Sequence, residues 1–161
     1  MTFTALSIIT IILSLAAVVA TFVPRIPSVA AAYAALVCAH LAGAIYVDAK
    51  ILIFWGVASA IVLGLRVLQP KALVMTAKGL PYVALATIAG TAIGYMISPT
   101  AASVILCASA GAVLGAIAYM RTPAAPCIAI TSSRFVEYLC AKGLPCVVTT
   151  SMAAIAIASL I

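Results

Sequence analysis

Charged side chains are scarce in this sequence. Its 161 residues include eight basic and two acidic side chains, so that 6% of the chain is charged while 68% is hydrophobic. About a quarter of the residues are charged in a soluble domain of ordinary composition, because such a surface has to be covered with groups that water solvates. The shortage excludes a water-soluble fold, and lipid is the solvent that this surface suits.

Paired cysteines are also missing. The five cysteines show no Cys-x-x-Cys or similar spacing, and they are Cys38, Cys107, Cys127, Cys140 and Cys146. Metal centres and disulfide frameworks contain cysteines at recognisable spacings in the sequence. A membrane helix accepts a single cysteine as a small apolar side chain. We therefore expect inert packing rather than a metal or redox role, with no metal ion and no cofactor.

Long apolar runs fill most of the chain. A membrane-spanning helix needs about 20 mainly apolar residues, and charges and prolines divide the chain into six such runs: 3–23, 27–47, 51–68, 80–98, 101–120 and 144–161. The first run lacks the preceding basic residues of a cleaved signal peptide, so we expect it to remain as a helix. The sequence predicts an all-α membrane protein, a single domain over 1–161 with about six transmembrane helices in three hairpins.

The basic residues mark one side of the membrane. In the loops between the predicted spans, Lys50 falls alone on one side and seven basic residues fall on the other: Arg25, Arg66, Lys71, Lys78, Arg121, Arg134 and Lys142. Short loops rich in Lys and Arg stay in the cytoplasm during insertion. We expect a bacterial inner-membrane protein with both termini outside, and no nucleic-acid partner, because the basic residues stand singly rather than in a cluster.

The segment 127–141, which precedes the last span, is mixed in character. Arg134 and Glu137 alternate with Phe135, Val136 and Tyr138. An amphipathic helix in the headgroup region has this pattern, and so does a solvated loop helix without a binding role. We predict an interfacial helix here.

Two stripes of small side chains follow the fourth and fifth spans at four-residue spacing. The first stripe is Ala86, Gly90, Gly94 and Ser98, and the second is Ser103, Cys107, Gly111 and Gly115. Across a turn at Pro99, the residue numbers of each facing pair add up to 201, so antiparallel helices bring the stripes into register. Small side chains let membrane helices approach closely. We predict a glycine zipper inside this hairpin, with self-association of two copies through the same stripes as the alternative.

A tetrapeptide, Lys-Gly-Leu-Pro, precedes both the fourth and the last span. It begins at Lys78 and again at Lys142, and the helices that follow keep matching at several positions, which indicates a 64-residue internal repeat. Proline is tolerated in the first helical turn, where its missing N–H would have had no partner. Convergent use of a good helix start therefore explains the recurrence equally well.

Few residues offer chemistry. His40 lies near the middle of the second predicted span, where an ionisable side chain is a candidate for proton handling or ligand contact, although a neutral imidazole bonded to a neighbouring helix fits as well. The only carboxylates, Asp48 and Glu137, fall on opposite sides of the predicted membrane, which excludes paired acid–base catalysis. No phosphate-binding or dinucleotide-binding motif is present. We expect no catalytic residues and no enzymatic activity.

The order of these features resembles a family of uncharacterised bacterial membrane proteins, the domain of unknown function 456. The resemblance rests on a first helix that ends in Val23-Pro-Arg-Ile-Pro, a third helix that contains Trp55, and the hairpin motifs Gly90-x3-Gly94, Pro99 and Gly111-Ala-x2-Gly115. It covers most of the chain. It implies a Gly-rich helical hairpin and no known activity.

Two functions fit the sequence. The first is a non-enzymatic inner-membrane protein, packed through its small-residue stripes, that oligomerises or acts as a scaffold for another membrane protein. The second is a small transporter or channel with His40 near the pathway. A polar cavity around His40 would favour the second function.

Overall fold

The computed structural model describes residues 2–24, 26–43, 47–69, 78–123 and 133–160, and all its elements in these ranges are helical. The helices are α1 (Thr2–Ala20), α2 (Ser28–Leu41), α3 (Ala49–Leu68), α5 (Leu80–Ile97), α6 (Ala101–Met120), α7 (Ser133–Tyr138) and α8 (Leu144–Ala158), with a π-helical turn η1 (Leu139–Gly143) between the last two. The all-α prediction is confirmed for this part of the chain.

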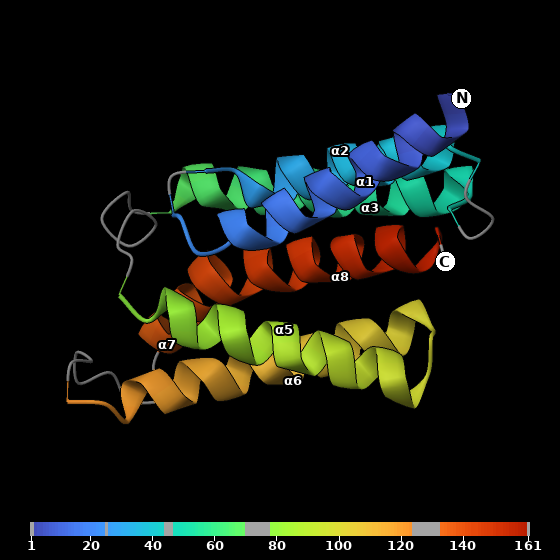
Figure 1. Cartoon of the computed structure of the whole chain (residues 1–161). Helices are drawn as coiled ribbons and strands as arrows, with labels where there is room; N and C mark the ends of the chain where they lie inside the picture. The colour runs from blue at the N-terminus through green and yellow to red at the C-terminus, as the bar shows by residue number, and fades with distance from the viewer. Residues whose placement is uncertain (1, 25, 44–46, 70–77, 124–132, 161) are drawn as a thin grey trace.

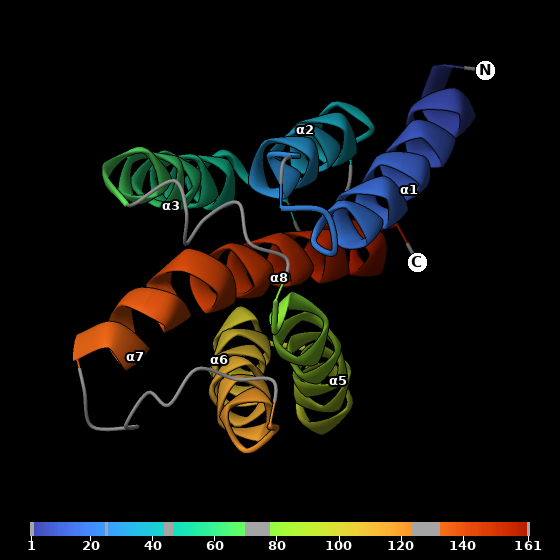
Figure 2. The same cartoon turned by 90° about the vertical axis from the view of Figure 1, so that its left-hand side faces the viewer.

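Helix α8 lies between two layers of helices. Helices α1, α2 and α3 form one layer, and the α5–α6 hairpin forms the other (Figure 1). Seen along the bundle, α8 crosses between the two layers (Figure 2), and it packs against helices of both. The last helix of the chain therefore forms the centre of the molecule.

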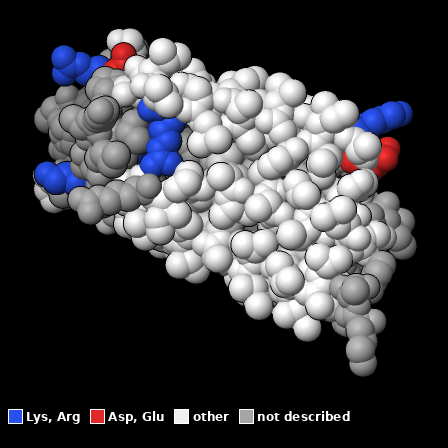
Figure 3. All heavy atoms as spheres, turned by 90° about the horizontal axis from the view of Figure 1, so that it is seen from above, with Lys and Arg blue, Asp and Glu red and all other residues white. Residues whose placement is uncertain are grey.

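Charged residues gather at the two ends of the molecule. The view in Figure 3 shows a broad middle band without Lys, Arg, Asp or Glu among the described residues. Large apolar side chains are exposed along the helices, as in Ile12, Ile61 and Leu114. Four helices are long and apolar enough to cross a membrane: Ala49–Leu68, Leu80–Ile97, Ala101–Met120 and the continuous helix Ser133–Ala158. The apolar stretches Ala5–Ala20 and Ser28–Leu41 are shorter.

Helix α2 ends earlier than the predicted span 27–47. Its last residue is Leu41, because Gly43 adopts a left-handed φ of 70°. The N–H groups of Ala42 and Gly43 close the helix on the carbonyls of Cys38 and His40, which is a common glycine-dependent way to end a helix. The 14 residues of α2 measure only about 21 Å at 1.5 Å per residue, so the prediction was wrong about where this helix ends.

The segment before the last span is not a separate interfacial helix. Its residues 127–132 lie outside the described part, and from Ser133 the chain runs as one helix through η1 into α8. Phe135 and Tyr138 are buried while Arg134 and Glu137 are exposed, so the helix is amphipathic as expected. Pro145 offers no N–H to the preceding turn, and the chain widens there into a π-helix, in which the N–H of Leu144 bonds the carbonyl of Leu139.

The two Lys-Gly-Leu-Pro segments differ in conformation. Gly79 precedes α5 with a left-handed φ of 77°, whereas Gly143 has a helical φ of −70° inside the continuous helix. The proline occupies the first turn in both cases. The same four residues therefore begin a helix after a loop in one place and continue a helix in the other.

Candidate functional site

The small-residue stripes meet between α5 and α6. A Cβ atom added at Gly90 would overlap the carbonyl oxygen of Cys107, and one added at Gly111 would overlap the carbonyl oxygen of Ala86. A Cβ atom added at Gly94 would lie 2.9 Å from the Cβ atom of Cys107. One added at Gly115 would lie 2.9 Å from the Cβ atom of Ala86. Only glycine leaves room for this backbone contact.

The hairpin turn adds a hydrogen bond between the two helices. The Ser103 hydroxyl donates to the carbonyl of Gly94 at 2.9 Å. Ser98 lies at the end of α5, where its hydroxyl is 3.3 Å from that of Thr100. Seven of the eight stripe residues thus lie at the α5–α6 contact, while Ser98 belongs to the turn.

Three consecutive polar residues in the middle of α8 are buried: Thr149, Thr150 and Ser151. Thr149 donates to the Ser28 hydroxyl of α2 at 3.3 Å, and Thr150 accepts from Thr91 of α5 at 3.1 Å. α8 is thereby hydrogen-bonded to both layers. Sequence analysis missed these residues, because hydroxyl side chains in a helix can bond the backbone one turn earlier and so need no neighbouring helix.

His40 lies at the end of a helix and is not at its middle. It is the penultimate residue of α2, it is exposed, and its Nδ1 lies 2.6 Å from the carbonyl oxygen of Val47. Since a carbonyl only accepts, Nδ1 carries the proton in this bond. The predicted central depth of His40 was wrong, because α2 ends at Leu41. The imidazole links the end of α2 to the start of α3.

A cavity of about 650 Å³ opens at the end of the molecule where α3 begins. Its walls come from α3, the α5–α6 turn and the end of α8, and they include Trp55, Tyr95, Val104, Ile155 and Ala158. Protein interiors rarely hold voids larger than a water molecule, whereas small-molecule pockets fall in this size range.

The lining of this cavity includes three polar side chains at helix ends among mainly apolar ones. Lys50, Thr100 and Ser159 lie at the termini of α3, α6 and α8, and all three line the cavity. One helical turn farther into each helix, the lining residue is apolar: Phe54, Val104 and Ile155. The cavity therefore offers one cation and two hydroxyls at helix ends, next to walls that are mainly apolar. Its lining does not include His40.

A second cavity lies on the other side of α8. It measures about 290 Å³, and its walls come from α1, α5 and α8. Tyr95, Ala154 and Ala158 line both cavities. The gap between the two layers is thus open on either side of the end of α8.

The carboxylates lie far from one another. The Asp48 side chain accepts a bond from the N–H of Ala49 and caps α3, while Glu137 is exposed on α7. Figure 1 places the start of α3 and α7 at opposite ends of the bundle. Among the described residues, no three His, Cys, Asp or Glu side chains are close enough to hold a metal ion.

These features define an all-helical protein with apolar helices, a backbone-packed hairpin and an amphipathic cavity between its layers. The chain matches no family model, no curated protein and no solved structure. The resemblance to the domain of unknown function 456 stays a prediction from its motifs.

Proposed function

We propose that this chain is a non-enzymatic, six-span membrane protein that binds a lipid-like amphiphile in the cavity between α3, the α5–α6 turn and α8. The ligand has an anionic or strongly polar head and an apolar chain. The domain of unknown function 456 is its proposed family. The observation that carries the proposal is the mixed lining, with Lys50, Thr100 and Ser159 at helix ends and Phe54, Val104 and Ile155 one turn farther into the same helices.

The proposed topology follows from charge. Among the described residues, Arg66, Lys78, Arg121, Arg134 and Lys142 belong to the segments at one end of the bundle, and Lys50 to the other. The positive-inside rule assigns the basic end to the cytoplasm. Both termini lie at the end of the bundle where α3 begins (Figure 1). Both are therefore external in this topology of a bacterial inner-membrane protein. α1 and α2 complete six spans together with their flanking apolar residues.

The small-residue stripes act in this proposal as a glycine zipper inside the hairpin. Gly90, Gly94, Gly111 and Gly115 are buried against the neighbouring helix of the same chain, so the glycines of both stripes are already used within the hairpin. Oligomerisation or partner binding through these glycines would require the hairpin to open. The zipper instead keeps the α5–α6 turn in place as one wall of the cavity.

The alternative function is a small transporter or channel. The two cavities between the layers support it, whereas His40 lies outside the lining of the larger cavity. The two cavities flank the end of α8 and share Tyr95, Ala154 and Ala158. Movement of the hairpin relative to α8 would join them. Binding in the larger cavity is common to both functions and is the step to test first.

Native mass spectrometry of the protein, extracted in a mild detergent, tests the binding. We expect a co-purifying amphiphile on the wild type, and about tenfold less of it on Lys50→Gln, the usual effect of losing one charge-assisted contact. Ala101→Phe, which narrows the cavity, should also remove it. Ala102→Phe is the matched control, because Ala102 is the neighbouring exposed residue outside the lining. Equal retention by all four proteins would refute the proposal.

A further inference from the structure

The smaller cavity, between α1, α5 and α8, has an almost wholly apolar lining. It measures about 290 Å³, and apart from Thr91, Tyr95 and Thr150 every lining side chain is a hydrocarbon. The Thr91 and Thr150 hydroxyls lie 3.1 Å apart and are bonded to each other, and Thr150 also donates to the carbonyl of Cys146. An apolar cavity of this kind stays dry and takes apolar ligands.

This cavity is elongated along α8. Its lining on α8 extends from Thr150, in the middle of the helix, to Ala158, the last residue of the helix. At 1.5 Å per residue, this stretch measures about 12 Å. The lining therefore runs from the end of the bundle where α3 begins toward its middle, which is the direction of a lipid chain in the same half of the membrane.

The smaller cavity adjoins the larger one, the amphiphile cavity of the proposed function. Tyr95, Ala154 and Ala158 line both. The two alanines are one turn apart on one face of α8. On one side of them Ile155 lines the amphiphile cavity, and on the other side Ile157 lines the smaller one. Seen along the bundle, α3 and α6 lie to the left of α1 and α5 (Figure 2), so the two cavities lie on either flank of α8.

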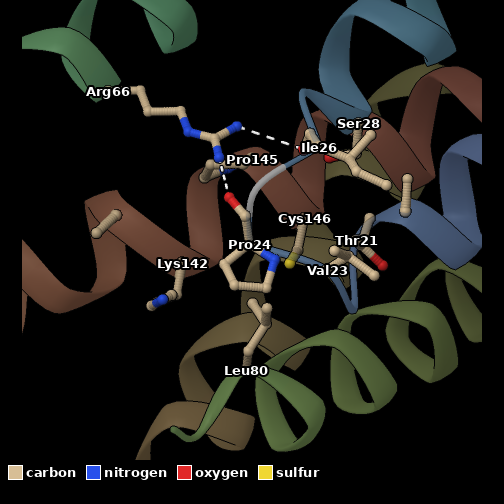
Figure 4. A pocket seen from close by; sticks show the side chains of 12 residues that line it. Thr21, Val23, Pro24, Ile26, Ser28, Arg66, Leu80, Lys142, Pro145 and Cys146 are labelled. Atoms are coloured by element: carbon tan, nitrogen blue, oxygen red, sulfur yellow. Dashed lines mark hydrogen bonds between the residues drawn. The ribbon is translucent and has the colours of Figure 1, made fainter. Parts of the chain in front are cut away.

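The cleft at the opposite end of the bundle differs in size and lining. Its volume is about 30 Å³, which takes about one water-sized group. Arg66 lines it, and the guanidinium is bonded to the carbonyls of Pro24 and Ile26 (Figure 4). This cleft is too small for a lipid chain. Among the described residues, the two chain-sized cavities therefore adjoin the same end of the bundle.

We propose that the amphiphile has two apolar chains, one in each cavity, so that the ligand is an anionic diacyl lipid that straddles the end of α8. This inference rests on the proposed function, because the amphiphile cavity, with Lys50 in its lining, has to hold the head and the first chain. Once that part is bound, binding of the second chain is an intramolecular step, which raises the affinity of the whole molecule. A one-chain amphiphile leaves the smaller cavity to detergent.

Native mass spectrometry with two lipids of the same head tests the second chain. The delipidated protein in mild detergent is titrated with dioleoyl phosphatidylglycerol and with its one-chain lyso form. We expect the wild type to bind the two-chain lipid about tenfold more tightly, a modest gain for two linked contacts.

A substitution in the smaller cavity should remove this preference. Ala92 is exposed on α5 and lines only the smaller cavity, so Ala92→Phe should lower the affinity for the two-chain lipid to that for the lyso form and leave lyso binding unchanged. Ala89→Phe is the matched control, because Ala89 is exposed on the same helix outside both linings. It should retain the preference of the wild type.

The possible results separate this inference from the proposed function. Equal binding of the two lipids by the wild type would overturn the second chain and leave the proposed function standing. Failure of both lipids to bind would refute the proposed function as well. Retention of the preference in Ala92→Phe, or its equal loss in Ala89→Phe, would overturn the smaller cavity as the site of the second chain.

A crosslinking measurement on the wild type needs no variant. The probe is a phosphatidylglycerol with a photoreactive group in each chain, irradiated in complexes that carry one lipid. We expect a single lipid to join Phe54 or Val104, which line only the amphiphile cavity, to Ile88 or Ile157, which line only the smaller one. Crosslinks confined to the residues of one cavity would overturn the proposal.

Discussion

The hydroxyl groups of Thr91 and Thr150 lie 3.1 Å apart, both buried, and they join α5 to α8. Thr150 also donates to the carbonyl of Cys146 at 2.8 Å, one turn earlier in α8. The pair connects the hairpin to the central helix at the level where the smaller cavity begins, since both residues line that cavity. It joins the α5 and α8 walls of the smaller cavity, which shares Tyr95, Ala154 and Ala158 with the larger one.

Replacement of Thr91 and Thr150 by valine measures this link. We expect each single change to lower the free energy of unfolding, and the coupling between them in a double-mutant cycle to be about 0.6 kcal/mol, the average for such bonds in membrane helices. Thr122→Val is a control, because the Thr122 hydroxyl donates to the carbonyl of Tyr119, three residues earlier, and not to a neighbouring helix. A coupling of zero would show that the two layers are not joined here.

The hairpin contact predicts a contrast between glycines. Gly90→Ala and Gly111→Ala should each destabilise the protein by about 2 kcal/mol, the range for an overpacked interior, because the added methyl group overlaps a backbone carbonyl. Gly64→Ala should raise stability slightly, since glycine is a poor residue within a helix and its added Cβ meets nothing within 4 Å. Thermal unfolding of the three variants compares them, and equal effects would contradict the predicted zipper.

The two Lys-Gly-Leu-Pro segments give a second contrast. Gly79→Ala should be strongly destabilising, because Gly79 has a left-handed φ and its added Cβ would overlap the Tyr138 hydroxyl and the Tyr119 ring. Gly143→Ala should cost much less, since it has a helical φ and its nearest neighbour is the flexible end of the Leu139 side chain. Identical losses of Tm would contradict the different conformations of the two segments.

The proposed topology is tested by cysteine labelling in a variant whose five native cysteines are replaced. Arg121→Cys and Arg134→Cys should react only when the reagent reaches the cytoplasm, while Lys50→Cys should react from outside, because all three residues are exposed at the ends of the bundle. Labelling of Arg121→Cys from outside would reverse or refute the assigned orientation.

Composition and spacing predicted a helical chain and the register of one helix pair, but not where α2 ends or that the last helix begins at Ser133. The low charge content indicated an all-α membrane protein, and the pairing of Gly90 with Gly111 and of Gly94 with Cys107 follows from four-residue spacing about a turn. The first prediction needs only the composition of the chain, and the second needs only residues that are close in sequence. The contact distances between these positions agree with that register.

Other features depend on which helices become neighbours. The position of α8 between the layers could not be predicted, since the bonds of Thr149 and Thr150 join it to residues 121 and 59 positions away. The depth of His40 was mistaken, because the apolar run continues after Gly43 although the helix does not. The amphipathic cavity combines residues of α3, α6 and α8 that no sequence pattern relates.

Photocrosslinking tests the central claim, binding in the amphiphile cavity, most directly. A phospholipid with a photoreactive group in its acyl chain is irradiated with the protein, and the labelled residues are mapped by mass spectrometry. We predict that Phe54, Val104 and Ile155 of the cavity are labelled well above Leu106 and Leu114, which are 68% and 65% exposed on α6, and that Lys50→Gln reduces this excess. Uniform labelling of all exposed apolar residues, unchanged in Lys50→Gln, would contradict the account.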